Sequence, residues 1–171
     1  MPSAPLNLGQ LYDDHAQAIF GFLLNLTRSE ADTHDLLQEL FVKLATRPDL
    51  LKGVIDDRGF LLRSAHHAAV DLLRRQEARR RRHESVSADA MVLHEPAAHP
   101  DEQLFRDSLA VALGELPFEQ RAVIHLKLWE GLTFETIAAT LGLSPNTAAS
   151  RYRYGLDKLR ERLRPLYEEI R

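Results

Sequence analysis

The chain has 171 residues and a formal net charge of −3; 44% of the residues are apolar, 27% are charged and none is cysteine. This balance supports a packed core, and the lack of cysteine excludes disulfide bonds, thiolate metal sites and cysteine nucleophiles. No apolar run approaches the roughly 20 residues of a membrane-spanning helix and no basic-then-apolar leader begins the chain, so we expect a soluble, cytoplasmic protein without membrane contact.

Helical periods recur through the first 82 residues, and no alternating strand pattern interrupts them. A second helix is predicted over residues 32–45, after a break at Ser29 and before Pro48. The stripe of the first helix would be Tyr12, Ala16, Ile19, Leu23 and Leu26, and that of the second Leu37, Leu40, Phe41 and Leu44.

A third helix is predicted from about Phe60 into an arginine run that ends at Arg82, in the segment "FLLRSAHHAAVDLLRRQEARRRR". Arginines on a helix face can bind duplex phosphates, although a solvated, arginine-rich helix end is the plainer interpretation. The apolar stripe would be Leu61, Ala65, Ala68 and Leu72, and the opposite face carries Arg63, His66, His67, Val70 and Arg74.

Residues 83–100, "HESVSADAMVLHEPAAHP", hold two prolines and no sustained period. A structureless stretch of this length is uncommon inside one compact domain, so it predicts an interdomain linker. We therefore expect an all-α protein with two small helical domains, residues 1–82 and 101–171, joined by residues 83–100.

The second domain begins with a helix predicted over residues 101–115 and broken by Pro117. The next helix would cover residues 118–130, because Gly131 is the residue type expected just past a helix C-cap. The inward side chains of residues 101–116 would be Leu104, Leu109, Leu113 and Leu116.

The stretch "TIAATLGLSPNTAASRYRYG", residues 136–155, predicts two helices joined by a glycine-bearing turn of three residues, which is the helix-turn-helix signature. Thr133 would cap a helix over residues 134–141, and Gly142 would end it. Ser144 would cap the last helix, to about Leu163. Small side chains at Ala138 and Ala139 would let the two helices cross closely, and the buried stripe of the last helix would be Ala148, Tyr152, Leu156, Leu159 and Leu163.

The remaining side chains near the start of the last helix suit a DNA major groove, in which arginine grips guanine and asparagine or serine bonds base edges or phosphate. An α-hairpin in any small bundle could show the same turn. The candidate DNA-binding residues are Asn146, Thr147, Ser150, Arg151, Arg153 and Tyr154.

Charge is segregated along the chain. Residues 58–83 carry eight arginines against two acids, and residues 151–164 carry six Lys or Arg against two acids. Between them, residues 84–107 have six acids and one arginine, while residues 30–57 have seven acids and three bases. Two basic segments separated by acidic ones indicate two contacts with a polyanion.

An enzyme is not predicted. The His34-Asp35 pair invites a metal-dependent phosphohydrolase, but no matching set of ligands accompanies it, and the adjacent His66 and His67 point to diverging helix faces. The sequence has no glycine-rich phosphate loop and no nucleophile elbow. We expect no catalytic residues, no metal and no cofactor.

Taken together, these segments resemble the extracytoplasmic-function (ECF) sigma factors, the two-domain promoter-specificity subunits of bacterial RNA polymerase. The resemblance covers nearly the whole chain. "DTHDLLQELFVKL" resembles the region-two helix that docks on the polymerase clamp, and "FLLRSAHHAAVDLLRR" the helix that meets the minus-ten promoter element. "LGELPFEQRAVIHLKLWEGLTFETIAATLGLSPNTAASRYRYGLDKLRERL" resembles region four, which binds the minus-thirty-five element and the polymerase flap.

The resemblance implies partners and site residues. Core polymerase would be bound at its clamp and flap, promoter DNA as duplex and as single strand, and an anti-sigma or recruiting factor is a further possible partner; in the holoenzyme the protein would lie on the nucleoid. Residues 48–59 resemble the loop that captures a flipped base, so that opening needs no ATP. The polymerase contact would comprise Asp35, Leu36, Gln38, Glu39 and Phe41, the last partly supporting the fold, and the promoter-facing helix Arg63, His67, Asp71, Arg74 and Arg75. Among the candidates in region four, Ser150 and Arg151 match the family best.

Some positions depart from the family. It often has Trp where Phe60 stands, Arg-Asn or a similar pair at His66 and His67, and Lys or Arg at Ala149. Weakened promoter reading would leave room for a recruiting factor, which is one hypothesis. The main alternative function is a stand-alone helix-turn-helix regulator that acts as a dimer on a palindromic operator and never joins polymerase.

Overall fold

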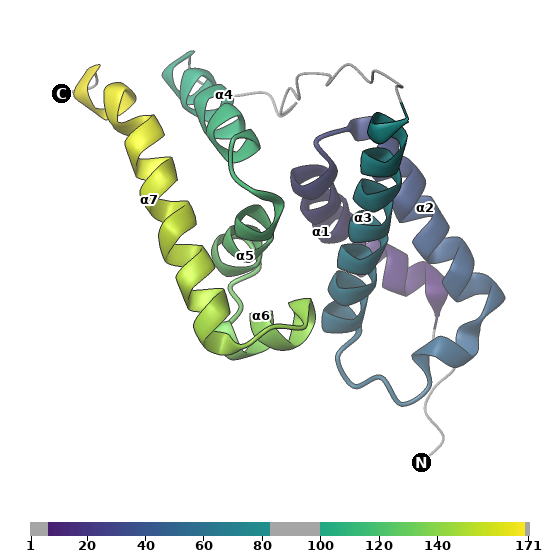
Figure 1. Cartoon of the computed structure of the whole chain (residues 1–171). Helices are drawn as coiled ribbons and strands as arrows, with labels where there is room; N and C mark the ends of the chain where they lie inside the picture. The colour runs from purple at the N-terminus through teal and green to yellow at the C-terminus, as the bar shows by residue number, and fades with distance from the viewer. Residues whose placement is uncertain (1–6, 83–99, 170–171) are drawn as a thin grey trace. The chain divides into compact units, whose positions relative to one another are not determined.

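The computed structural model describes residues 7–82 and 100–169, in which every regular element is a helix (Figure 1). The helical elements form two compact units. The all-α class predicted from the sequence is confirmed. The first unit comprises α1 (Leu8–Thr27), α2 (Glu30–Thr46), the 3-10 helix η1 (Pro48–Leu51) and α3 (Asp57–Arg81); the second comprises α4 (Pro100–Gly114), α5 (Phe118–Leu128), α6 (Phe134–Leu141) and α7 (Pro145–Glu169).

The predicted linker lies almost entirely outside the described residues, apart from Pro100, which begins α4. Each unit is therefore described by itself.

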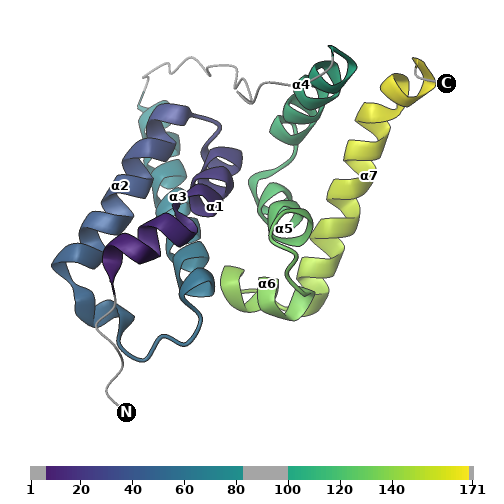
Figure 2. The same ribbon diagram turned by 180° about the vertical axis from the view of Figure 1, so that it is seen from behind.

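In the first unit, the three helices pack against one another, and α1 contacts both α2 and α3 (Figure 2). Apolar spacing along each helix puts large side chains on the shared faces. Full burial of one such side chain stabilises the fold by about 1.5–3 kcal/mol. The core is formed by Ile19, Phe22, Leu23 and Leu26 of α1, Leu44 of α2, and Leu61 and Leu62 of α3.

A hydroxyl network fixes the turn between α1 and α2. Arg28 ends α1 in the left-handed conformation, with φ of 59°, and burial lowers the pKa of its guanidinium. Ser29 then caps α2. The fully buried Thr33 donates from its Oγ1 to the Ser29 carbonyl at 2.8 Å, and its Oγ1 lies 2.8 Å from Oγ1 of Thr27. The hydroxyl groups of Thr27, Ser29 and Thr33 therefore all have hydrogen-bond partners within the turn.

In the second unit, α4, α5 and α6 all pack against the long helix α7 (Figure 1). Arg121, which is buried in α5, donates from Nη1 to the carbonyls of Gly114 and Leu116 at 3.3 and 2.8 Å and so ties α5 to the end of α4. Where α4 meets α7, the core consists of Ala112, Leu113, Leu116, Ile124, Leu159 and Leu163.

The predicted apolar stripes are right in the middle of the helices and wrong near two helix ends. Tyr12 is 47% exposed, and its neighbour Leu11 is buried instead. Leu104 in the first turns of α4 is 52% exposed. A period specifies a face of a helix, but the neighbouring helix must extend far enough to cover that face.

Two further details correct the sequence interpretation. In α3 the buried arc includes Leu62 and Ala69, whereas Ala68 is only half-buried, because α3 contacts both α1 and α2. In α6, Ala138 is 4% exposed at the helix crossing but Ala139 faces solvent.

Helix boundaries also differ, and α3 begins at Asp57 rather than near Phe60. α5 ends at Leu128 rather than residue 130, and Gly131 follows with φ of 65°. α7 continues past the predicted end at Leu163 to Glu169, although Pro165 removes one backbone donor from its last turns.

Candidate nucleic-acid interface

The turn between α6 and α7 is built from residues that the backbone requires. Thr133 caps α6, and Gly142 ends it in the left-handed conformation with φ of 70°. Its N–H donates to the Ala138 carbonyl. Ser144 then accepts the Thr147 N–H on its Oγ at 3.1 Å and starts α7. These contacts confirm the predicted helix-turn-helix and set the angle at which α7 leaves α6.

The candidate DNA-binding side chains on α7 form a polar surface on the side away from the core. The Arg153 guanidinium lies over the Tyr154 ring, 5.4 Å from its centroid, so the two side chains form one flat, cationic contact area. Of the six predicted residues, Asn146, Arg153 and Tyr154 are exposed, and Thr147, Ser150 and Arg151 are half-buried.

Close packing behind this surface holds α7 in place. Gly155 is buried, and a Cβ built on it would lie only 2.5 Å from Cδ1 of Ile124 in α5. Tyr152 packs edge-on against Phe134 of α6, with ring centroids 5.6 Å apart, and the Lys127 Nζ lies over the Phe134 ring, 4.6 Å from its centroid. The predicted stripe did not include Gly155, yet Gly155 is buried in close contact with α5.

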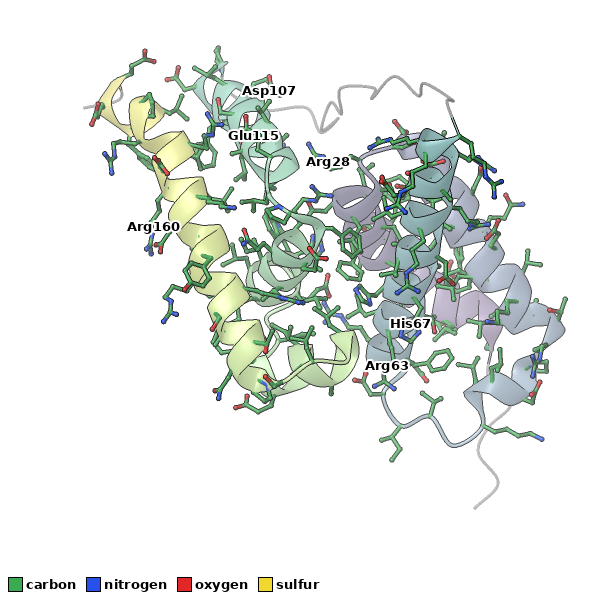
Figure 3. The ribbon with its side chains drawn as sticks, in the orientation of Figure 1. Arg28, Arg63, His67, Asp107, Glu115 and Arg160 are labelled. Atoms are coloured by element: carbon green, nitrogen blue, oxygen red, sulfur yellow. The ribbon has the colours of Figure 1, made fainter. Side chains whose placement is uncertain are left out.

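On α3, the five predicted promoter-facing residues are all exposed. Positions 63, 67, 71 and 74 fall within an arc of about 80° on the helix, so they form one face. Figure 3 shows Arg63 and His67 on the N-terminal part of α3. The Arg75 Nε donates to the Asp71 carbonyl at 3.4 Å, and the Asp71 carboxylate interrupts the cationic face. The exposed set is Arg63, His67, Asp71, Arg74 and Arg75.

The loop between η1 and α3 carries an apolar residue that the sequence interpretation passed over. Ile55 is 101% exposed, while Leu51, four residues earlier, is buried. The sequence did contain a signal for this exposure. Ile55 lies between Gly53 and the pair Asp56 and Asp57, and neither helical nor strand periodicity accounts for an apolar residue there.

On α2, the five predicted polymerase-binding residues divide into two sets. Asp35, Gln38 and Glu39 are exposed and form an acidic surface. Leu36 and Phe41 are 3% and 8% exposed, so they support the core rather than present a contact surface. The helix period explains the division, because Leu36 lies on the buried side of α2 while its polar neighbours are exposed.

An apolar groove of about 480 Å³ runs between α1 and α2 beside this acidic surface. The Tyr12 and Phe41 rings meet edge-on in it, with centroids 4.9 Å apart, and Val42 is 53% exposed on its α2 side. Tyr12 was predicted to lie in the core, but it lines this surface groove instead.

Of the four positions that depart from the family pattern, Phe60, His66 and Ala149 are half-buried, and His67 is exposed. His34, the proposed start of a metal motif, packs against the Phe20 ring at 4.8 Å and lies 3.7 Å from Glu30. In residues 7–82 and 100–169, no three His, Asp or Glu side chains converge as a metal site. Over those same ranges, no helix has the length and apolar character needed to cross a membrane.

Comparison with known families matches both units. A family model described as Sigma-70 region 2 matches residues 11–79, and one described as Sigma-70, region 4 matches residues 112–161. The first range contains α2 and most of α1 and α3, and the second contains α6, the turn and α7 as far as residue 161.

Several curated proteins are similar along most of their length. RNA polymerase sigma factor CarQ of Myxococcus xanthus is 34% identical over 163 residues, which cover 94% of this chain and 91% of CarQ. ECF RNA polymerase sigma factor SigL of Mycobacterium tuberculosis strain H37Rv is 32% identical, with 91% of this chain and 88% of SigL covered. The sigma factor RpoE, solved in complex with the anti-sigma factor NepR from Bartonella quintana, has the same fold, with a TM-score of 0.77, 21% identity and coverage of 91% and 96% of the two chains.

Proposed function

This chain belongs to the extracytoplasmic-function (ECF) RNA polymerase sigma factors, and we propose on that premise how its residues divide the work of a promoter-specificity subunit. It binds core RNA polymerase, recognises promoter DNA and helps to open it for initiation. The observation that carries this function is the presence of both sigma regions, in order, on one chain. The stand-alone dimeric regulator is not favoured, because such a protein has no use for region two.

We assign the domains as residues 1–82 for core polymerase and the minus-ten element, and residues 101–171 for the minus-thirty-five element. In the second, the helix-turn-helix would place the first half of α7 in the major groove. Arg151 and Ser150 would contact base edges, and Asn146, Thr147, Arg153 and Tyr154 would contact neighbouring edges or phosphates. Exposure of the Arg153–Tyr154 pair, opposite the close Gly155 packing, supports this orientation.

In the first domain, the α3 face would follow the promoter backbone. Arg63 and Arg74 would contact phosphates, and His67 could donate to a phosphate or a base. Asp71, which is an acceptor only, would bond an exocyclic amino group of a base rather than a phosphate. The loop of residues 48–59 would hold a base from the separated non-template strand, and contacts made there would replace lost stacking without ATP.

The sigma factors among its relatives act in transcription rather than catalysis, and we propose no enzymatic activity for this chain. We place its action in the cytoplasm, on the nucleoid. One solved relative is bound to an anti-sigma factor, which supports a similar inhibitory partner here.

The function is tested by reconstitution with core polymerase. The purified chain is expected to co-purify with core enzyme and to direct run-off transcription from one asymmetric promoter. Mapping its transcription starts would identify that promoter. Failure to associate under conditions in which an established sigma factor associates would overturn the assignment, and binding to a palindromic site as a dimer would revive the alternative.

The acidic surface of α2 predicts a polymerase contact that charge reversal weakens. Replacing Asp35 and Glu39 with lysine is expected to raise the Kd for core enzyme about fivefold. Each exposed ion pair with polymerase that is lost contributes little, but the new lysines would also repel a basic polymerase surface. The affinity is measured by titration of labelled protein. A matched control reverses the exposed Asp13 and Asp101, which changes the net charge equally; an equal loss in both variants would reject a local contact.

The arginine run at the end of α3 predicts a salt-dependent contact with DNA. Replacing Arg79 and Arg80 with alanine is expected to reduce the slope of log K against log salt for holoenzyme and promoter by roughly 0.9 for each lost phosphate contact. The control variant replaces Arg47 and Arg106 with alanine. These arginines form ion pairs with nearby acids, at 3.4 and 2.7 Å, and are not predicted to contact DNA. An unchanged slope in the Arg79 and Arg80 variant would mean that these side chains are only solvated.

A further inference from the structure

The ring of Tyr154 differs in kind from the other candidate side chains on the polar surface of α7. The other five carry hydroxyl, amide or guanidinium groups, which suit hydrogen bonds to base edges and phosphates. Tyr154 is 57% exposed, so more than half of a large and mostly apolar side chain is open to water. Because burial of an aromatic ring against a partner is favourable, this position suits an apolar contact.

A neighbouring guanidinium restrains the ring. The Arg153 guanidinium lies over the Tyr154 ring, 5.4 Å from its centroid, and tyrosine has only two side-chain torsions to fix on binding. Asp157, the acid about one turn further along α7, lies 3.5 Å from Arg160 and so has a cation of its own. The exposed Arg153 is therefore accessible to a phosphate while it covers part of the ring.

The position of Tyr154 along α7 sets which base it can reach. It follows Ser150 by four residues and Arg151 by three, which are the spacings of neighbours on a helix surface. The rise over three or four residues is about 4.5–6 Å, or roughly one to two base pairs of a duplex. With α7 in the major groove, the ring would meet a base edge within about two base pairs of the base that Arg151 contacts.

We propose that Tyr154 reads a thymine in the upstream promoter element through its C5-methyl group, while Arg153 binds the adjacent phosphate. In the major groove, thymine presents a methyl group where cytosine presents an amino donor and the purines present polar edges, so an apolar ring discriminates in its favour. The proposal rests on the function assigned above. It adds to that function the base, and the group on the base, that one side chain of α7 recognises.

The test removes one methyl group from the DNA and one ring from the protein. Each thymine of the mapped upstream element is replaced in turn by deoxyuridine, which lacks the C5-methyl group, and the Kd of reconstituted holoenzyme is measured. One replacement, within about two base pairs of the base read by Arg151, is expected to raise the Kd about three- to fivefold, as for the loss of one buried methyl group. In Tyr154→Ala the same replacement should change the Kd by less than about 1.5-fold, because the two changes remove the same contact.

Two further variants separate the ring from other roles. Tyr154→Phe keeps the ring and lacks the hydroxyl, so it should retain the full difference between thymine and uracil. Tyr167→Ala removes another exposed tyrosine of α7, 59% exposed and near the Phe105 ring, and should retain the difference as well. Because Tyr154 is largely exposed, its variants are expected to keep an unfolding temperature close to that of the unchanged protein.

Equal sensitivity to the methyl group in Tyr154→Ala and in the unchanged protein would overturn the proposed contact. An upstream element in which no thymine replacement changes the Kd would overturn it as well. Loss of the difference in Tyr154→Phe would assign the contact to the hydroxyl group and so reject recognition of a methyl group. If the unchanged protein forms no holoenzyme, or the holoenzyme protects no upstream element, the failure lies in the proposed function and not in Tyr154.

Discussion

Replacing Arg151 with alanine is expected to weaken holoenzyme binding to the cognate upstream promoter element by about 1–3 kcal/mol, if its guanidinium grips a guanine through two hydrogen bonds. Arg151 is half-buried near the start of α7, so part of its side chain is covered and part stays accessible. On an element in which the contacted base is changed, Arg151→Ala should bind nearly as tightly as the unchanged protein. Competition binding with the two elements measures the difference.

Arg160 provides the matched control. It lies about 14 Å further along α7, it is exposed, and its Nη1 is 3.5 Å from the Asp157 carboxylate. Arg160→Ala should therefore lower the affinity for the two elements equally, or leave both affinities unchanged. Equal losses on all sequences for Arg151→Ala would make Arg151 a phosphate contact, and sequence reading by α7 would then depend on Ser150 and its polar neighbours.

Gly155→Ala is expected to destabilise the second unit, although alanine favours helix more than glycine by about 1 kcal/mol. The added Cβ would lie 2.5 Å from Cδ1 of Ile124, which is fully buried, so the Ile124 side chain would have to shift within a packed core. Overpacking of this kind costs about 1–3 kcal/mol. For a unit of this size, each kcal/mol lowers the unfolding temperature by roughly 4–8 °C, which calorimetry would detect.

Ile124→Val tests the cause, because valine lacks the Cδ1 atom that collides. The substitution alone costs about 0.5–1.5 kcal/mol. In its presence, Gly155→Ala should change sign and become stabilising, since the remaining effect is helix propensity. A double-mutant cycle with no coupling between the two positions would show that the contact is not what requires glycine at 155.

The sequence predicted the helix-turn-helix well because local chemistry determines it. Thr133 and Gly142 fix the two ends of α6 through hydrogen bonds and a left-handed turn, which neighbours in the chain specify by themselves. The same holds for Ser144 at the start of α7. Predicting these positions required no knowledge of the helix against which each helix packs.

Burial at individual positions could not be predicted as well, because it depends on what lies across from a helix. The motif predicts a contact role for Leu36, yet Leu36 is buried in the core. The apolar period predicts a core role for Leu104, yet Leu104 is 52% exposed. The close approach of α5 to Gly155 depends on the crossing of two helices distant in sequence. The prominence of Ile55 likewise depends on how two ends of a loop are held.

One unbroken helix carries both the reading surface and the packing against α4. Ala148 is buried near its start, and Leu163 is buried in the cluster with α4, about 22 Å further along. If α7 moves as a rigid body, a tilt of about 5° at Leu163 displaces the start of the helix by about 2 Å. This displacement is enough to misalign the proposed hydrogen bonds to bases. Arg162 of α7 forms an ion pair of 2.6 Å with Glu115, just past the end of α4, so replacing either residue is expected to loosen the hold of α4 on the far end of α7.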